Sequence, residues 1–198
     1  MLTVRDLSNR VLQPACFRVD AGECVAVQGP SGAGKSVLLR AVADLDPAAG
    51  EVRLDGALRE EMTAPEWRRR VTYLAAESGW WSDRVADHFS PADTPRAAPL
   101  VEALGLPGEA LGWPVSRLST GERQRLALVR ALVQEPRVLL LDEPTGALDL
   151  DATHRVEGLL RDALARGMGV LIVTHSPDQA DRLAKRRLRV EAGRVREA

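Results

Sequence analysis

The chain has 198 residues, about the size of one compact domain with a sizeable core. Its 27 basic and 28 acidic residues nearly cancel, which excludes the strongly basic surface typical of nucleic-acid-binding domains, so no nucleic-acid partner is expected. No stretch approaches the roughly eighteen apolar residues that span a bilayer, and charges interrupt the N-terminus where a secretory signal is apolar. We therefore expect a cytoplasmic globular protein.

The cysteine and lysine positions are informative because both residue types are rare. Cys16 and Cys24 are the only cysteines, and neither has a partner at metal-ligand spacing, so we expect two reduced thiols on strands. Arginine supplies nearly all of the positive charge, and only Lys35 and Lys185 are lysines. Lys35 is thus a position where the compact ammonium group is preferred to the usual arginine.

Short apolar, β-branched runs alternate with stretches of helical periodicity along the chain. The expected strands are 24–28, 71–74, 138–141 and 170–173, and the expected helices include 37–45, 122–134 and 153–167. Continuous apolar strands separated by helices indicate a parallel sheet covered on both faces. Pro136 and Gly167 mark helix ends, and Ser176 followed by Pro177 predicts a helix start.

Residues 78–118 differ from their flanks. Repeated prolines divide this stretch into short pieces and the strand pattern disappears, so we expect a small helical insertion. The beginning, roughly residues 2–28, and the end, 187–197, are expected to form β-hairpins. The prediction is one α/β domain spanning 1–198, with a core of about 1–77 and 119–198.

A phosphate-binding motif follows the first apolar strand. The sequence GPSGAGKS matches the P-loop pattern G-x-x-x-x-G-K-S in full, between a strand and a helix. Its glycines let the backbone N–H groups curl around phosphate oxygens, and the helix N-terminus adds positive potential. Lys35 is expected to place its positive charge near the β- and γ-phosphates, and the Ser36 hydroxyl is expected to bind Mg²⁺. ATP and Mg²⁺ are the expected cofactors, bound by Gly29, Pro30, Ser31, Gly32, Ala33, Gly34, Lys35, Ser36 and Val37.

An acidic pair follows a later apolar strand, in the sequence RVLLLDEP of residues 137–144. Asp142 is expected to bind Mg²⁺ through water, and Glu143 to polarise a water for attack on the γ-phosphate. Strands often end in acidic residues at turns, so this pair alone leaves a structural explanation open. The preceding P-loop favours the catalytic one.

Three further segments narrow the class of P-loop protein. Residues 118–122, LSTGE, resemble the signature peptide of ABC-type ATPases, whose usual form is LSGGQ. GALD, residues 146–149, resembles the D-loop of that family, and VTHS puts His175 where the family has its switch histidine. In order and spacing the resemblance covers essentially the whole chain, so we expect an ABC-type ATPase of the small, single-cassette kind. Its fold would be a P-loop NTPase core with a helical subdomain of about 78–118 plus the signature helix, 119–134.

The resemblance implies Mg-dependent ATP hydrolysis with Glu143, His175 and Lys35 as catalytic residues. Two cassettes, expected to be identical, would pair head-to-tail around two ATP molecules. Ser119 and Gly121 of one would then contact the γ-phosphate bound to the other. Closing and opening of this dimer would power a separate transmembrane permease, which would hold the protein at the cytoplasmic face of the cell membrane.

Three features depart from the family pattern. The glutamine that usually follows the strand 71–74 is replaced by Ala76, and either Glu77 substitutes for it after a register shift or its role is absent. Thr120 and Glu122 replace a glycine and a glutamine in the signature peptide. The aromatic residue that stacks on adenine is missing, and Arg10 is expected to stack through its guanidinium plane instead.

Four tryptophans complete the set of candidate residues. Trp80 and Trp81 follow the missing glutamine, close to the groove through which transporter cassettes of this family dock, and adjacent tryptophans suit a pocket for a partner's coupling helix. The alternative is that both fill the core of the insertion. Trp67 and Trp113 are expected to pack within the domain.

Two other functions compete with transport. A soluble ABC ATPase acting on ribosomes or DNA is less favoured, because no second cassette, basic linker or coiled coil is visible. A P-loop kinase would leave the signature peptide and the switch histidine unexplained.

Overall fold

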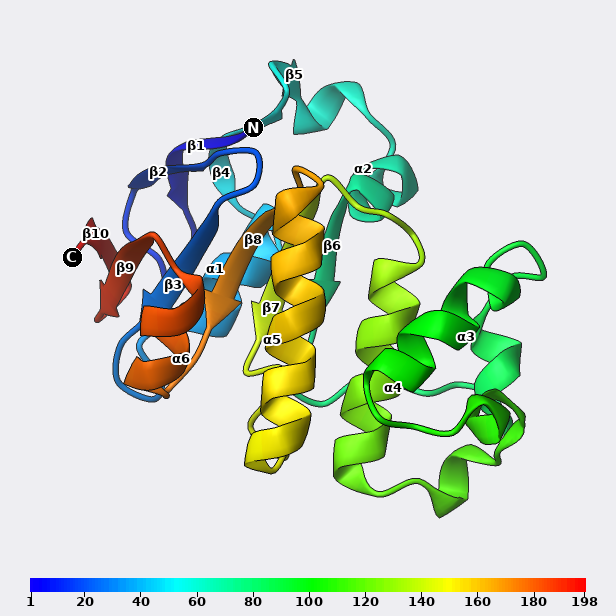
Figure 1. Cartoon of the computed structure of the whole chain (residues 1–198). Helices are drawn as coiled ribbons and strands as arrows, with labels where there is room; N and C mark the ends of the chain where they lie inside the picture. The colour runs from blue at the N-terminus through cyan, green and yellow to red at the C-terminus, as the bar shows by residue number, and fades with distance from the viewer.

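The chain folds into two β-sheets with helices packed around them (Figure 1). The computed structural model describes every residue from 1 to 198. The smaller sheet is antiparallel, in the order β2-β1-β4-β5, and consists of β1 (Leu2–Ser8), β2 (Ala15–Val19), β4 (Ala49–Leu54) and β5 (Ala57–Leu58). The larger sheet has the order β10-β9-β3-β8-β7-β6 and consists of β3 (Cys24–Gln28), β6 (Val71–Leu74), β7 (Val138–Asp142), β8 (Gly169–Val173), β9 (Arg186–Glu191) and β10 (Arg194–Glu197).

The larger sheet is parallel except at its β10 edge, and it separates two hydrophobic cores. Successive side chains of a strand point to opposite faces, so Ala26 enters one core and Val27 the other. Because both faces are covered, the central strands are apolar throughout, as the sequence predicted.

The helices divide between the two faces. The core on one face contains residues of α1 (Lys35–Val42), α2 (Ala64–Arg70) and the antiparallel sheet. The core on the other face contains residues of α3 (Thr94–Ala103), α4 (Thr120–Leu132), α5 (Leu150–Ala165) and α6 (Pro177–Leu183). In Figure 1, α5 and α6 lie in front of the sheet and α1 behind it.

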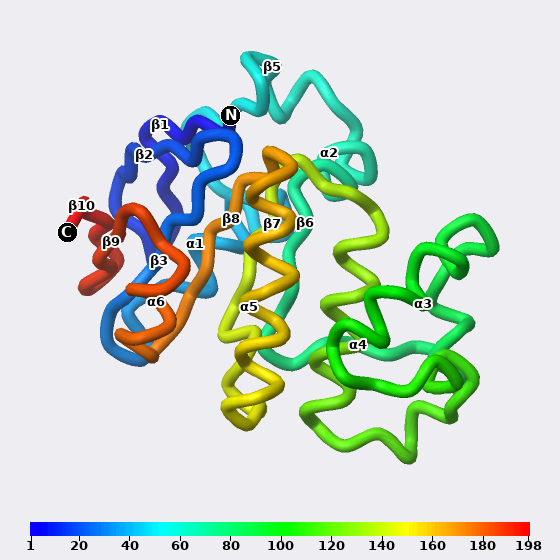
Figure 2. Tube along the Cα trace, viewed as in Figure 1, coloured from blue at the N-terminus to red at the C-terminus, as the bar shows by residue number.

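The segment 78–118 carries no strand of either sheet, as its prolines predicted. It consists of α3 and three 3₁₀ helices, Val85–His88, Gly108–Gly112 and Val115–Arg117. Figure 2 shows this segment and α4 on the side of the molecule opposite the two chain ends.

Two parts of the fold differ from the sequence prediction. Residues 2–28 do not form one hairpin: β1 and β2 pair antiparallel, whereas β3 joins the parallel sheet. Residues 49–70 gave no prediction, yet they contain β4, β5 and α2. Half of the β4 residues are exposed, and the strand forms by pairing with β1 in the smaller sheet, so no local hydrophobic pattern predicts it.

Other expectations are confirmed. Trp67 is fully buried and its Nε1 donates to the Val42 carbonyl at 3.0 Å, and Trp113 packs against the core with Arg117 over its ring. Cys16 and Cys24 are free thiols on strands. Ser176 caps α6 by accepting from the Gln179 N–H, and none of the helices combines the length and apolar character needed to cross a bilayer.

The turn between β9 and β10 packs against the P-loop. Gly193 donates its N–H to the Ala33 carbonyl at 3.0 Å, and its own carbonyl accepts from the Gln13 N–H at 2.9 Å. Gly193 has φ 75°, and a Cβ at this residue would lie 1.9 Å from the Val11 carbonyl oxygen. Gly193 therefore fixes the positions of three segments relative to one another: the C-terminal hairpin, the loop after β1 and the P-loop.

We predict that Gly193→Ala destabilises the protein far more than Gly56→Ala. Both glycines have positive φ, so each alanine pays a similar backbone strain of about 1–2 kcal/mol, but Gly56 faces open space. The clash at Gly193 should add about 1–3 kcal/mol and also weaken ATP binding, because Ala33 loses its support. Urea unfolding and ATP titration of both variants measure the difference. Equal losses of stability would contradict the packing role of Gly193.

Candidate active site

The P-loop connects β3 to α1 and leaves several of its N–H groups free. Gly29 passes so close to β9 that a Cβ would lie 2.1 Å from the Val190 carbonyl oxygen. The N–H groups of Ser31, Gly32 and Gly34 donate to no carbonyl or side-chain acceptor within the chain. Gly32 has φ 75° with no heavy atom near its missing Cβ, so the loop is open toward its concave side. Free, converging N–H groups fit a phosphate group.

Lys35 lies inside this loop. Its side chain is buried, and its Nζ donates to the carbonyls of Gly29 and Pro30, each at 2.9 Å. These bonds hold the ammonium group against the loop backbone. A buried point charge in that position adds to the positive potential that the N–H groups create.

Asp142 ends β7 and is fixed by a neighbour on β6. The Tyr73 hydroxyl donates to Asp142 Oδ2 at 3.0 Å, and burial, followed by the charge of Asp142, raises the pKa of Tyr73. Asp142 is buried, and Ser36 is the second residue of α1 and is exposed. Both residues offer oxygen ligands of the kind that Mg²⁺ prefers. No cluster of three His, Cys, Asp or Glu residues surrounds them.

Glu143 and His175 meet because β7 and β8 are parallel neighbours. Asp142 pairs in register with Val173, so the residues that follow these two strand ends lie side by side. His175 Nε2 lies 3.0 Å from Glu143 Oε1, and both side chains are partly exposed. The sequence predicted each residue separately, and the register brings them together.

The backbone of Glu143 is strained and held from several sides. Its φ is 49°, in the left-handed region that costs a side-chain-bearing residue about 1–2 kcal/mol. Its N–H donates to the Val173 carbonyl at 3.0 Å, and its carbonyl accepts from Gln124 Nε2 at 2.7 Å and from the Gly146 N–H at 3.2 Å. Gln124, on α4, was not among the predicted site residues, because a glutamine in a helix carries no signal of such a contact.

Glu143 and His175 line a pocket of about 430 Å³, and Asp142 does not line it. Most of the predicted P-loop residues line it together with Glu143 and His175. Its lining is Val11, Ser31, Gly32, Gly34, Lys35, Ser36, Val37, Glu143 and His175. A larger pocket of about 570 Å³ lies between α3 and the C-terminal ends of α4 and α5, and contains none of the predicted site residues.

The loop after β1 supplies one pocket residue that the sequence did not indicate. Val11 lines the pocket and is 50% exposed, whereas the neighbouring Arg10 is exposed and does not line it. An exposed valine beside a P-loop has no distinguishing pattern in the sequence. It became recognisable only when the fold placed it beside Gly34, whose missing Cβ would lie 3.3 Å from Val11 Cγ1.

The signature residues lie outside the pocket. Ser119 caps α4: its hydroxyl accepts from the Glu122 N–H at 3.2 Å, and Glu122 Oε2 accepts from the Ser119 N–H and hydroxyl, each at 2.8 Å. The N–H bond and then the hydroxyl bond hold the pKa of Glu122 below its usual value. Gly121 packs against the D-loop, where a Cβ would lie 3.2 Å from the Ala147 carbonyl oxygen.

Ala76 and Glu77 also lie outside the pocket, and both are exposed. The substitution of Glu77 for the missing glutamine stays a prediction.

Comparison with known proteins identifies the family. The family model described as "ABC transporter" matches residues 12–146. The chain belongs to the ABC-type ATPases. It is therefore an ATP-binding and ATP-hydrolysing cassette, and the resemblance drawn from the signature peptide, the D-loop and His175 is confirmed.

Two relatives of similar identity are named for different cargoes, and a solved structure shares the fold. The aliphatic sulfonates import ATP-binding protein SsuB of Albidiferax ferrireducens is 40% identical over 98% of this cassette, which covers 72% of that protein. The Fe(3+) ions import ATP-binding protein FbpC of Streptomyces coelicolor is 41% identical over 98% of the cassette, which covers 58% of that protein. A solved ATP binding subunit of an ABC transporter superimposes with a TM-score of 0.91 at 27% identity, covering 100% of the cassette and 89% of that chain. The predicted α/β fold class is confirmed.

Proposed function

We propose that this cassette is the ATP-hydrolysing subunit of an ABC transporter and drives a separate membrane permease by nucleotide-driven dimerisation. The observation that carries the proposal is that one chain supplies only part of an ATP site. The P-loop, Glu143 and His175 line the pocket, whereas Ser119 and Gly121 do not. A second cassette, arranged head-to-tail, would supply the signature residues to each bound ATP. We propose an identical partner.

Within such a dimer, each of these residues has a distinct task. The free N–H groups and Lys35 bind the phosphates. Ser36 and Asp142 would hold a Mg²⁺ ion, which would supply positive charge to the phosphates. The Glu143 carboxylate takes a proton from the attacking water, and His175, 3.0 Å from it, orients that carboxylate and contacts the γ-phosphate. The strained backbone of Glu143 aims its side chain into the pocket.

The signature peptide opposes dimer closure through its own contacts. The Ser119 hydroxyl donates to Glu122, so it must exchange this carboxylate for the partner's γ-phosphate. Glu122 also brings a negative charge to a phosphate-facing surface, while the positive N-terminal end of α4 attracts the phosphate. Closure thus depends on the balance between these two effects.

The docking surface for the permease would be centred on Trp81. Trp81 is 70% exposed, whereas Trp80 packs against the core, so the two neighbouring tryptophans separate into a contact residue and a support. The buried His88 ring touches both tryptophans, and the Arg130 guanidinium lies 4.8 Å from each ring centre. Two buried donors here, Trp80 Nε1 and Arg130 Nη1, have no hydrogen-bond partner. An exposed tryptophan such as Trp81, packed against His88 and Arg130, is suited to anchor a partner helix.

The transport direction and the location of the cassette are part of this proposal. Both named relatives are import proteins, which supports import, with the cassette attached to its permease at the cytoplasmic face of the cell membrane. The two have different cargo at nearly the same identity to this chain, 40% and 41%. The cassette sequence therefore does not specify the cargo.

The catalytic assignment predicts that Glu143→Gln abolishes ATP hydrolysis while ATP-dependent dimerisation remains. The amide keeps the shape of the side chain but does not accept the water's proton, so turnover should fall at least about a hundredfold. Phosphate release and size-exclusion chromatography with ATP measure the two properties. Normal hydrolysis by this variant would contradict the role of Glu143.

The adenine assignment predicts that Arg10→Ala raises the Kd for ATP by about two- to fivefold, the loss expected for one stacking contact at an exposed site. Arg10→Lys is the matched control, because lysine keeps the charge and loses the planar group. Isothermal titration with Mg-ATP measures both. If the lysine variant binds like the parent and only the alanine variant is weakened, charge and not stacking explains the effect.

The docking assignment predicts that Trp81→Ala releases the cassette from its permease. The test co-expresses the cassette with a candidate multi-span permease and measures co-purification in detergent. Leu45→Ala is the control, because Leu45 is also an exposed apolar residue but lies outside this cluster. Unchanged co-purification of the Trp81 variant would contradict the docking surface.

A further inference from the structure

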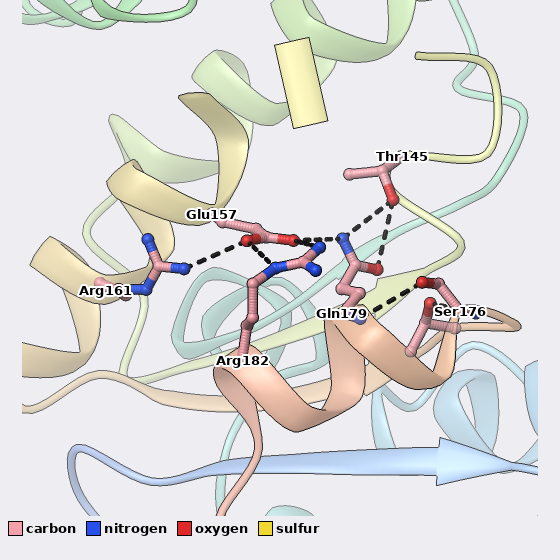
Figure 3. A network of polar contacts seen from close by, with 7 residues as sticks. Thr145, Glu157, Arg161, Ser176, Gln179 and Arg182 are labelled. Atoms are coloured by element: carbon pink, nitrogen blue, oxygen red, sulfur yellow. Dashed lines mark hydrogen bonds and ion pairs between the residues drawn. The ribbon is translucent and has the colours of Figure 1, made fainter. Parts of the chain in front are cut away.

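A buried glutamate on α5, Glu157, anchors a network of polar side chains (Figure 3). The network includes residues of the segments that follow β7 and β8. Glu157 is fully buried and accepts from Arg182 Nε at 2.8 Å and Nη2 at 2.7 Å, and from Arg161 Nη2 at 3.1 Å. Burial by itself raises the pKa of Glu157, but the bonds and charge of Arg182, with Gln179 and Arg161, outweigh burial and lower it. Glu157 is therefore a charged, fixed anchor between α5 and α6.

Gln179, on α6, extends this anchor to the loop after β7. Its Nε2 donates to Glu157 Oε1 at 3.4 Å and to Thr145 Oγ1 at 3.0 Å. The Thr145 hydroxyl also lies 3.2 Å from Gln179 Oε1, so one hydroxyl faces both ends of the amide, as Figure 3 shows. The backbone N–H of Gln179 donates to Ser176 Oγ at 3.2 Å.

The two ends of this network lie next to the two catalytic side chains. Thr145 is two residues beyond Glu143, and Ser176 directly follows His175. The Glu143 carbonyl accepts from the Gly146 N–H, so a shift of Thr145 reaches Glu143 through one tight turn. Gln179 thus joins the loop that carries Glu143 to the loop that carries His175.

We propose that Gln179, held by Glu157, is a positioning residue that sets the contact between Glu143 and His175 through Thr145. This inference rests on the catalytic roles proposed above. None of the network residues lines the nucleotide pocket, so they influence the reacting groups without touching ATP. Breaking the bonds that join Gln179 to Thr145 and Glu157 should therefore alter turnover and leave nucleotide binding intact.

The key experiment compares Thr145→Val, which removes the hydroxyl and keeps the shape, with Thr145→Ser, which keeps the hydroxyl. Displacing a catalytic group by a fraction of an ångström costs about tenfold in rate, so we expect the valine variant to lose about tenfold in kcat. Its KM and its Kd for Mg-ATP should stay within about twofold, and the serine variant should recover the parent kcat within about twofold.

Arg161→Met is the matched control for a purely structural role. It removes one ion pair from Glu157 but leaves the bonds of Gln179 to Thr145 and Glu157 in place. We expect parental kcat from this variant. Equal kcat losses in the Arg161 and Thr145→Val variants, or an unchanged kcat in the latter, would overturn the proposal.

A spectroscopic measurement separates positioning from a general loss of stability. The chain has three histidines, so the imidazole nitrogens of His175 can be assigned by nuclear magnetic resonance using a His175→Gln reference. Thr145→Val should shift the His175 signals and leave those of His88 and His154 unchanged. An unchanged His175 spectrum would also overturn the proposal.

Parallel assays keep this inference distinct from the proposed function. If Glu143→Gln is inactive and Thr145→Val is fully active, the positioning network is wrong and the catalytic assignment stands. If Glu143→Gln hydrolyses ATP normally, the catalytic assignment itself is wrong, and the positioning proposal falls with it.

Discussion

The parallel pairing of β3, β8 and β7 is the constraint on which the active site depends. Parallel strands end at the same edge of a sheet, so the segments that follow them meet there. The P-loop follows β3, Asp142 and Glu143 end β7, and His175 follows β8. Hydrophobic burial on both faces fixes the register of these strands, and thereby fixes the distance between groups that lie far apart in the chain.

At this edge of the sheet, backbone contacts hold the loops in place. Gly29 passes against Val190, and Gly193 reaches Ala33, so the C-terminal hairpin supports the phosphate loop directly. Glu143 is held in a strained conformation by β8 and by Gln124 of α4. The helix α4 therefore contacts the loop that carries Glu143 in its own chain, while Ser119 and Gly121 at its start do not line that chain's own pocket.

Helix α4 connects the loop that carries Glu143 to the two surfaces at which we propose that partners bind. α4 carries Ser119 at its start and Arg130, which lies beside Trp80 and Trp81, near its end. One rigid helix thus runs from the proposed dimer contact to the proposed permease contact, with Gln124 holding Glu143 between them. A displacement at either end has a direct physical route to the catalytic loop.

The sequence by itself determined the parallel sheet, the P-loop, the acidic pair and the family, because each depends on a local run of residues with a specific spacing. Tertiary structure alone decided which tryptophan is exposed, that Val11 reaches the pocket, that β4 pairs with β1, and that Glu157, Gln179 and Thr145 form one network. These features arise from contacts between segments distant in the chain. Their residues carry no local pattern, so only the packed fold brings them together.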